Sequence, residues 1–290
     1  MKFLGKLFGK DFFVQNRAKL DTNLSVTDFF QTDFVKKIID ENKKTTTLLK
    51  PHRSKNEISW KESKFGGNPN LESFSEYPKC TSCDSSLNFV FQVYKTDFPE
   101  FYFPGVSNIF QLFRCPNNSC KDSYNEFCDH KMFHYYSKVD CENNNTFLKT
   151  ANISKDIEAE VPDCYLKPLK TFDFPNFDDF ENDDLDIIEQ KFGENFLDEF
   201  IDKYNAISHT KLWGYPSFTQ GPCRPRCNCG KNKEFLFQLS SDDAEDGTEY
   251  PPSPDNWSSH GIMIGDVGNI YYFLCKDCGV ESIESNWDCY

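Results

Sequence analysis

The chain is poor in positive charge. Its 32 lysines and arginines stand against 46 aspartates and glutamates, which gives a formal net charge of −14 over 290 residues. Proteins that hold nucleic acid do so largely through cationic side chains that displace counterions, so the composition argues against a nucleic-acid partner. A strongly acidic surface instead attracts positive charge, which favours a basic protein as partner, although acidity often serves only solubility.

Long apolar runs are also missing. No stretch approaches the roughly 18 apolar residues of a membrane-spanning helix. The opening residues 1–13 place lysines among phenylalanines and leucines and do not have the apolar centre or cleavage site of a secretory signal. Their spacing fits a short amphipathic helix, for which packing on its own domain is favoured over membrane contact. We therefore expect a cytoplasmic protein with no stable membrane insertion.

Motifs of catalysis are absent too. The sequence contains no GxSxG, Walker loop or GxGxxG. His130 and His134 have helical i,i+4 spacing but lack the glutamate of an HExxH motif. Asp266 has no visible partner for acid–base chemistry, and Gly265–Asp266 favours a turn. The sequence leans away from an enzyme.

Cysteine, by contrast, is abundant, with 13 residues. The odd count argues against a fully paired disulfide framework. In a reducing compartment, clustered cysteines are more often metal ligands than disulfides. The alternatives are buried free thiols or an oxidised pair.

Eight of the cysteines form two quartets with metal-ligand spacing. They are Cys80-x2-Cys83 with Cys115-x4-Cys120, and Cys227-x-Cys229 with Cys275-x2-Cys278. In a zinc ribbon, two such knuckles at the ends of neighbouring strands supply four thiolates in a tetrahedron. The one-residue spacing is tight, but Gly230 can adopt the positive φ that it needs. Cys223 competes with Cys229 as the ligand. Closed all-cysteine sites are structural, so we expect up to two structural zinc ions.

The two quartets belong to segments that look alike. Each segment opens on a lysine followed by a glycine and a proline, at 64–69 and 211–216. The same nine-residue step then leads from Cys83 to Gln92 and from Cys229 to Gln238, at the ends of the apolar runs LNFVFQ and EFLFQ. A second aromatic run, IFQLF or IYYFL, leads into the second cysteine pair. The repetition predicts an internal duplication.

The predicted fold is a β-rich α+β protein of two pseudo-repeated antiparallel halves with zinc-ribbon-like knuckles and flanking helices. We expect an N-terminal mixed extension at 1–59 with a helix over 26–42, a first β half at 60–165 and a second at 210–290. Residues 166–209 read as an acidic linker with a helix from about 184 to 207, weakened by Gly193. The halves are expected to form one compact domain.

Several runs resemble a known family. They are SKFGGNP (63–69), KLWGYPSFTQ (211–220), FQLSSD (237–242), GDVGNIYYF (265–273) and the terminal CY. These resemble the YwqG-like family, a bacterial domain of unknown function, over about 48–290. The cysteine pattern with FVFQVY (89–94) and CNCG (227–230) is also similar to the eukaryotic programmed-cell-death-2-like proteins. That resemblance implies a role in chaperoning a new small-subunit ribosomal protein.

Together these features predict a non-enzymatic, zinc-stabilised protein-binding module for a basic client, as a chaperone or an inhibitor. An immunity protein against a basic toxin is one form of this hypothesis. The alternative is a small-molecule-binding or enzymatic domain with a pocket between the halves, near Gly66, Gly67, Gly214 and Asp266. Gly66–Gly67 can cradle an anion, but a turn before Pro69 is favoured.

Overall fold

A computed structural model describes residues 24–74, 76–117, 119–122, 132–138, 160–180, 182–243 and 258–290. The expectations for residues 1–13 and for His130 fall outside these ranges. The chain divides into two compact units, Met1–Asn42 with Asp179–Tyr204, and Lys43–Asp178 with Asn205–Tyr290.

The first unit is helical. Its helices are α1 (Val26–Gln31), α2 (Asp33–Asn42), α3 (Asn182–Phe192) and α4 (Glu194–Lys203). The predicted helix over 26–42 is interrupted at Thr32, whose hydroxyl accepts the Val35 N–H. The predicted linker helix is likewise divided at Gly193, which has a φ of 102°. The buried Phe29 ring holds the unit together by contacting Phe192 and Phe196, with centroids 5.0 and 4.9 Å away.

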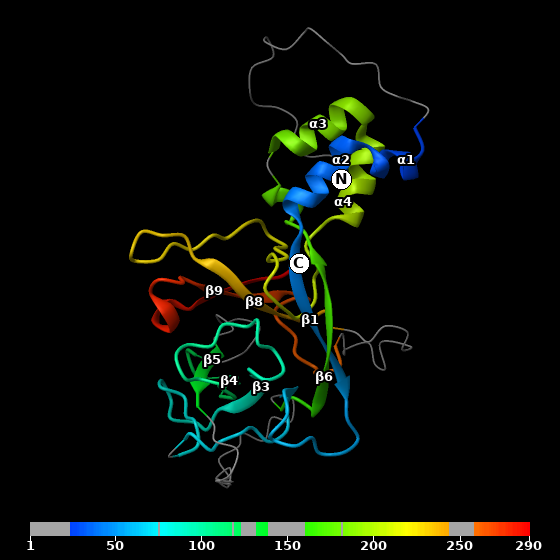
Figure 1. Ribbon diagram of the computed structural model, residues 1–290. Helices are drawn as coiled ribbons and strands as arrows, with labels where there is room; N and C mark the ends of the chain where they lie inside the picture. The colour runs from blue at the N-terminus through cyan, green and yellow to red at the C-terminus, as the bar shows by residue number, and fades with distance from the viewer. Residues whose placement is uncertain are drawn as a thin grey trace. The chain divides into compact units, whose positions relative to one another are not determined.

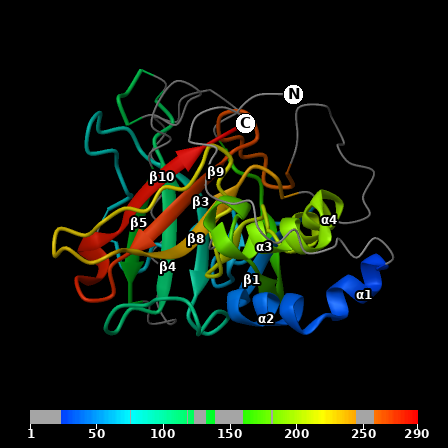
Figure 2. The same ribbon diagram turned by 90° about the horizontal axis from the view of Figure 1, so that it is seen from above.

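The second unit is built on one sheet of ten strands (Figure 1). The strands are β1 (Lys44–Arg53), β2 (Lys64–Phe65), β3 (Asn88–Tyr94), β4 (Ile109–Arg114), β5 (Met132–Ser137), β6 (Cys164–Asp173), β7 (Lys211–Leu212), β8 (Glu234–Ser240), β9 (Asn269–Leu274) and β10 (Glu284–Asp288). Their order is β10-β9-β8-β7-β1-β6-β2-β3-β4-β5, with every pairing antiparallel. The sheet curls into a half-barrel (Figure 2).

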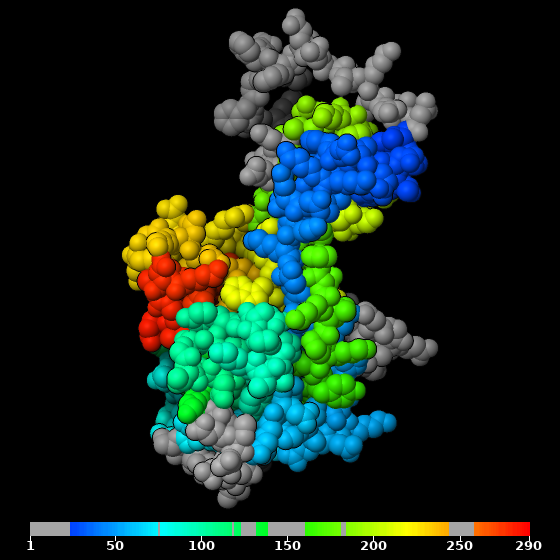
Figure 3. All heavy atoms as spheres, in the orientation of Figure 1, coloured from blue at the N-terminus to red at the C-terminus, as the bar shows by residue number. Residues whose placement is uncertain are grey.

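The strand order is symmetric about its central pair. β1 and β6 pair over ten residues, from Lys44 opposite Asp173 to Arg53 opposite Cys164. β7 to β10 continue the sheet from β1 and form one wing, and β2 to β5 continue it from β6 and form the other wing. Residues 164–173, which lie largely within the predicted acidic linker, are therefore a central strand. Figure 3 shows β1 and β6, in blue and green, side by side at the surface.

The core fills the inside of the curled sheet, where the two wings meet. Phe237 of β8 contacts Phe91 of β3 and Phe110 of β4, with ring centroids 6.0 and 5.3 Å apart. Phe237 also stacks on Tyr272 of β9 at 4.2 Å. Aromatic pairs of this kind add to the stabilisation that apolar burial provides. This packing accounts for part of the high phenylalanine content.

Each wing carries a bulge at the same place in its strand. The pairing of β3 with β4 shifts at Val90, and that of β8 with β9 shifts at Leu236. The two bulged carbonyls accept backbone N–H groups from the turns that follow β2 and β7, those of Gly66 (2.9 Å) and Trp213 (3.0 Å). A bulge increases the local twist, which helps the sheet to curl.

Candidate metal centres

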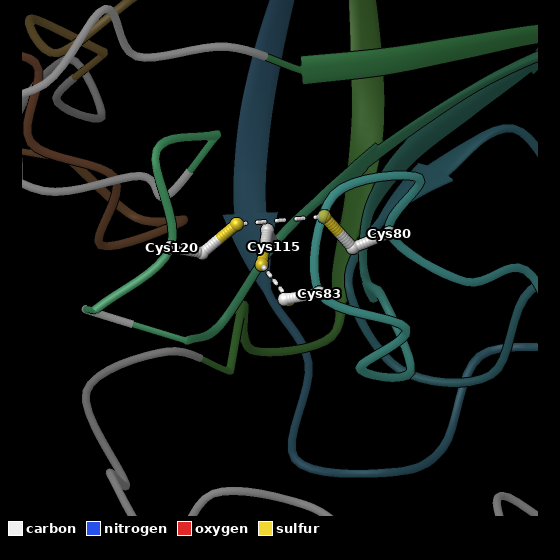
Figure 4. A group of neighbouring side chains, drawn as sticks. All are labelled: Cys80, Cys83, Cys115 and Cys120. Carbon is white, nitrogen blue, oxygen red and sulfur yellow. Dashed lines mark hydrogen bonds between the residues drawn. The ribbon is translucent and has the colours of Figure 1, made fainter.

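The first quartet lies where β3 begins and β4 ends. Cys80 and Cys83 belong to a tight loop before β3, in which the Cys80 N–H donates to the Ser85 carbonyl (2.8 Å). Cys115 follows β4 directly, and Cys120 comes from the next turn. Hydrogen bonding between β3 and β4 therefore brings two separate segments of chain together at one point (Figure 4).

The four sulfur atoms are spaced like ligands of one ion. The Sγ atoms of Cys80 and Cys120 are 3.7 Å apart, those of Cys83 and Cys115 are 3.6 Å apart, and all four lie within 4.8 Å of one another. All four thiols are free, and these distances far exceed the roughly 2.05 Å of a disulfide. A zinc ion bound to four sulfurs at about 2.3 Å sets their spacing at about 3.8 Å. The first quartet thus fits a tetrahedral metal ion.

Electrostatics in the first quartet favour an added cation. Burial raises the pKa of both Cys115 and Cys120. Burial also opposes ionisation of Cys83, but hydrogen bonds with Ser85 (Sγ–Oγ 3.3 Å), Cys120 and Cys115 together outweigh it and lower the pKa of Cys83 to about 6. The Cys83 thiol therefore loses its proton readily, whereas the Cys115 and Cys120 thiols tend to keep theirs. A coordinated cation deprotonates its thiol ligands and removes this conflict.

The second quartet occupies the matching place between β8 and β9. Cys227 and Cys229 lie in the loop before β8, Cys275 follows β9, and Cys278 precedes the 3-10 turn Gly279–Ser282. The Sγ atoms of Cys229 and Cys275 are 3.6 Å apart, and all four sulfurs again lie within 4.8 Å. Hydrogen bonding with Cys227 and Cys229 raises the pKa of Cys278 to about 12.

Gly230 makes the narrow spacing of the second quartet possible. It has a φ of 88°, and its N–H donates to the Cys227 carbonyl (2.8 Å). The group that comes together contains Cys229 and not Cys223. Cys223 instead packs against the buried cluster of Phe218, Tyr271 and Phe273.

Two buried lysines, which sequence reasoning did not single out, accompany the predicted glycines. Lys64 donates to the Ile58 carbonyl (2.8 Å) and to Asp163 Oδ1 (3.1 Å). Lys211 donates to the Ile207 carbonyl (2.6 Å) and to Asp173 Oδ2 (2.8 Å). Burial lowers the pKa of Lys211, and the Asp173 carboxylate opposes that shift. The sequence signal that could have found these residues is the lysine that begins both repeated runs.

The glycines make room for these aspartates. A Cβ added to Gly67 would lie 2.0 Å from Asp163 Oδ1, and one added to Gly214 would lie 2.4 Å from Asp173 Oδ2. The next N–H after Gly214, that of Tyr215, donates to the same Asp173 oxygen (2.8 Å). The backbone of each turn therefore lies close to the carboxylate that pairs with the lysine preceding it.

The other predicted positions do not gather into one pocket. Gly67 and Gly214 lie beside aspartates at opposite ends of β6, Asp163 and Asp173, which are ten residues and so about 33 Å of extended strand apart. A cavity of about 230 Å³ adjoins Gly67 and is lined by Gly67, Asn68, Asn88, Phe89, Glu160 and Val161. Asp266 is exposed in the turn at 265–267, where its carbonyl accepts the Tyr290 N–H (3.0 Å).

A buried carboxylate, Asp243, joins three segments and was also missed. It accepts hydrogen bonds from the Thr210 N–H (2.8 Å) and from His260 Nε2 (3.0 Å), and it lies 3.5 Å from His209 Nδ1. Burial opposes its ionisation, but these hydrogen bonds and the histidines hold the pKa of Asp243 at about 2. No sequence motif marks Asp243, because its partners come from distant turns.

Ser258 extends this network without forming a catalytic triad. Its Oγ lies 2.9 Å from His260 Nδ1, which also accepts the Ile262 N–H (3.0 Å). Ser258, His260 and Asp243 are only 1%, 0% and 2% exposed. A triad serine must face its substrate, and its base must be free to take a proton. The network therefore connects buried turns.

Within the described residues, no helix has the length and apolar character needed to cross a membrane. A comparison with curated proteins found no match. The family model described as "Domain of unknown function (DUF1963)" matches residues 63–289, which include both quartets and both lysine-containing turns. The chain therefore belongs to the DUF1963 family.

Proposed function

We propose that the chain is a non-enzymatic protein-binding module stabilised by two structural zinc ions, one in each cysteine quartet. The observation that carries the proposal is the spacing of the sulfur atoms. Three Sγ pairs are 3.6–3.7 Å apart, and within each quartet all four Sγ atoms lie within 4.8 Å of one another. Zinc favours tetrahedral all-cysteine sites, and such closed sites have no open position for substrate. The ions would fix strand ends of the sheet.

Elemental analysis of protein purified without added metal tests this directly. We expect about two zinc ions per chain, with Cys80→Ser and Cys278→Ser each losing one, since every ligand of a closed tetrahedron is needed. Cys223→Ser is the matched control and should keep both, because Cys223 lies outside the quartets. Protein that is folded and metal-free would refute the proposal.

An internal duplication explains why two sites exist. The symmetric strand order, the paired bulges at Val90 and Leu236 and the equivalent Lys64 and Lys211 support it. Each copy would run from a long strand through a short strand into two strands that carry a zinc-ribbon-like knuckle. The first strands are exchanged, because β1 pairs with β7 and β6 pairs with β2. We propose likewise that the chain is related to the YwqG-like family and, more distantly, to the programmed-cell-death-2-like proteins.

The partner we propose is a basic protein. The helical unit supports it, because α3 (NDDLDIIEQKF) and α4 (ENFLDEFIDK) contain many carboxylates and few lysines. Asp198, Glu199 and Asp202 of α4 are exposed. Charge complementarity of this kind mainly accelerates association and selects the partner. A chaperone client or a basic toxin would both meet this requirement.

The partner hypothesis is tested by affinity capture from native extract with a charge-neutralised control. A stoichiometric partner should be lost when Asp198→Asn, Glu199→Gln and Asp202→Asn are combined. The matched control neutralises three exposed carboxylates of the sheet unit, Glu57, Glu62 and Glu76, and should keep it. Equal capture by both variants would exclude the helical unit as the binding surface.

The second candidate function is a small-molecule site, supported by the cavity beside Gly67. A thermal-shift screen over metabolites tests it.

A further inference from the structure

The two quartets differ in their access to solvent. In the first, Cys80, Cys115 and Cys120 are buried, and Cys83 is partly buried. In the second, Cys229 and Cys278 are exposed, while Cys227 and Cys275 are buried. The sulfur spacing is the same in both, so the difference lies in what surrounds the ligands.

Apolar side chains cover the first quartet. It belongs to a buried cluster with Leu71, Tyr77, Leu87, Phe89 and Phe113, against which Phe74, Phe133 and Tyr135 pack. The segment before the knuckle and the edge strand β5 thus shield these sulfurs.

The loop of the second quartet stands in solvent. Asn228, Gly230 and Lys231 are exposed, and a Cβ added to Gly230 would meet no atom within 4 Å. The turn after Cys275 is similar, because Lys276 and Asp277 are exposed. A small solute can therefore reach the sulfur ligands of this site from outside.

We infer that the second quartet is an oxidation site for hydrogen peroxide, which converts its thiolates to a disulfide and releases the metal, while the first quartet retains its metal. The inference rests on the metal binding proposed above. Reactivity of cysteine follows thiolate character and access. Metal coordination supplies thiolates in both sites, so access decides between them.

The chemistry needs only the two nearest sulfurs and peroxide. The exposed Cys229 thiolate attacks one peroxide oxygen, the O–O bond breaks, and Cys229 sulfenic acid and hydroxide form. Cys275 Sγ, 3.6 Å away, then attacks the Cys229 sulfur and displaces a second hydroxide. The two sulfurs lose two electrons in forming the disulfide, and peroxide gains them. The metal keeps only Cys227 and Cys278, dissociates, and leaves these two thiolates to be protonated by water.

The test is zinc release from the full chain. Protein shown by elemental analysis to hold two zinc ions is treated with hydrogen peroxide, released zinc is read with a metallochromic dye, and disulfides are located by peptide mass. We expect one of the two ions to be released, with a loss of about 2 Da in peptides that join 227–229 to 275–278, as a disulfide requires. Reductant and added zinc should restore the second ion.

Single-site variants separate the two centres. Cys278→Ser keeps only the first ion and should retain it under peroxide, whereas Cys80→Ser keeps only the second and should lose it. If the first ion leaves as fast as the second, or if the disulfide maps to 80–120, the inference is wrong. If a variant does not fold, peptide mapping of the unmodified chain still decides. Protein without zinc at the start would instead refute the proposed function.

Discussion

Gly67 and Gly105 share a left-handed backbone but differ in their surroundings. Their φ values are 63° and 53°, so a side chain strains the backbone at either position. A Cβ at Gly67 would also meet Asp163 Oδ1 at 2.0 Å, whereas one at Gly105 would meet nothing within 4 Å. The pair therefore separates backbone strain from steric conflict.

We expect Gly105→Ala to lower the free energy of unfolding by about 1–2 kcal/mol through backbone strain alone. Gly67→Ala should lose about 1–3 kcal/mol more, because the added methyl displaces the carboxylate that pairs with Lys64. Urea denaturation of both variants checks this. Equal losses would mean that Asp163 moves aside without cost.

Asp243 should make the chain sensitive to acid. Its pKa of about 2 in the folded state lies below its ordinary value of 3.8. A depressed pKa contributes stability above the unfolded pKa, and that contribution is lost as pH falls from about 4 through about 2. The free energy of unfolding of the unmodified chain should therefore approach that of Asp243→Asn over this window. A constant difference between the two, measured by urea titration at each pH, would contradict the assignment.

The cysteine quartets could be predicted because ligand spacing is local in sequence. Cys227-x-Cys229 and Gly230 stand next to one another, and so do Cys80 and Cys83. The partners of Lys64 and Lys211 could not be found in this way. Asp163 comes beside Lys64 only through the pairing of β6 with β2, and Asp173 comes beside Lys211 only through the pairing of β6 with β1 and of β1 with β7. The contacts of Asp243 with Thr210 and His260 likewise could not be predicted, because these residues lie in turns far apart in the sequence.

At the level of strands and helices, the apolar runs that became β3, β4, β8 and β9 could be predicted because they are continuous and buried. β1 continues through Pro51 to Arg53. Proline is tolerated there because β7 pairs with β1 only at Thr47 and Leu48, so the strand edge beside Pro51 is free of that neighbour. β6 was missed because most of its residues are exposed, among them Tyr165, Leu169 and Phe172.

Removal of the proposed zinc ions should loosen the two cysteine loops, here called knuckles, without disturbing the central β1–β6 pair. In the first knuckle the Cys80 N–H donates to Ser85, and in the second the Cys227 N–H donates to Lys231, and neither loop has regular structure beyond a few such bonds. A structural metal contributes its binding free energy to the fold around it. With a chelator present, hydrogen exchange should accelerate at 80–85 and 227–231, while the β1–β6 pair stays protected. Restoring zinc is the control, and unchanged exchange at the knuckles would contradict a structural role.

Each compact unit of the whole molecule should respond separately to truncation. Within residues 1–42, the described part, 24–42, supplies α1 and α2 to the helical unit and no strand to the sheet. Their removal takes Phe29 away from Phe192 and Phe196, so α3 and α4 lose their buried contact.

We expect the chain that begins at Lys43 to lose helical circular dichroism yet still bind two zinc ions, because both quartets lie in the other unit. Elemental analysis and far-ultraviolet spectra measure the two effects. Loss of zinc together with helicity would show that the sheet unit depends on the helices.

The topology of the whole sheet lay beyond prediction from sequence. The repeated runs predicted two pseudo-repeated antiparallel halves that together form one compact domain. In the structure the central pair β1 and β6 joins the two wings. β1, expected within the N-terminal extension, is hydrogen-bonded to β7, and β6, expected largely within the linker, is hydrogen-bonded to β2. A local pattern of apolar residues does not specify which distant strand a segment pairs with, so the pattern alone could not place β1 and β6 at the centre of the sheet.

The long-range pairing of β1 also sets an order of events during synthesis. The first knuckle, at 80–120, can close on its own wing while the ribosome is still translating. β1 leaves the ribosome before that wing, but its partners are residues 164–173 and 211–212. It must therefore wait, unpaired, for more than a hundred residues of further chain, and contacts of such long sequence separation form slowly. Exposed strand edges in a nascent chain invite aggregation, so this interval is when the polypeptide itself most needs a chaperone.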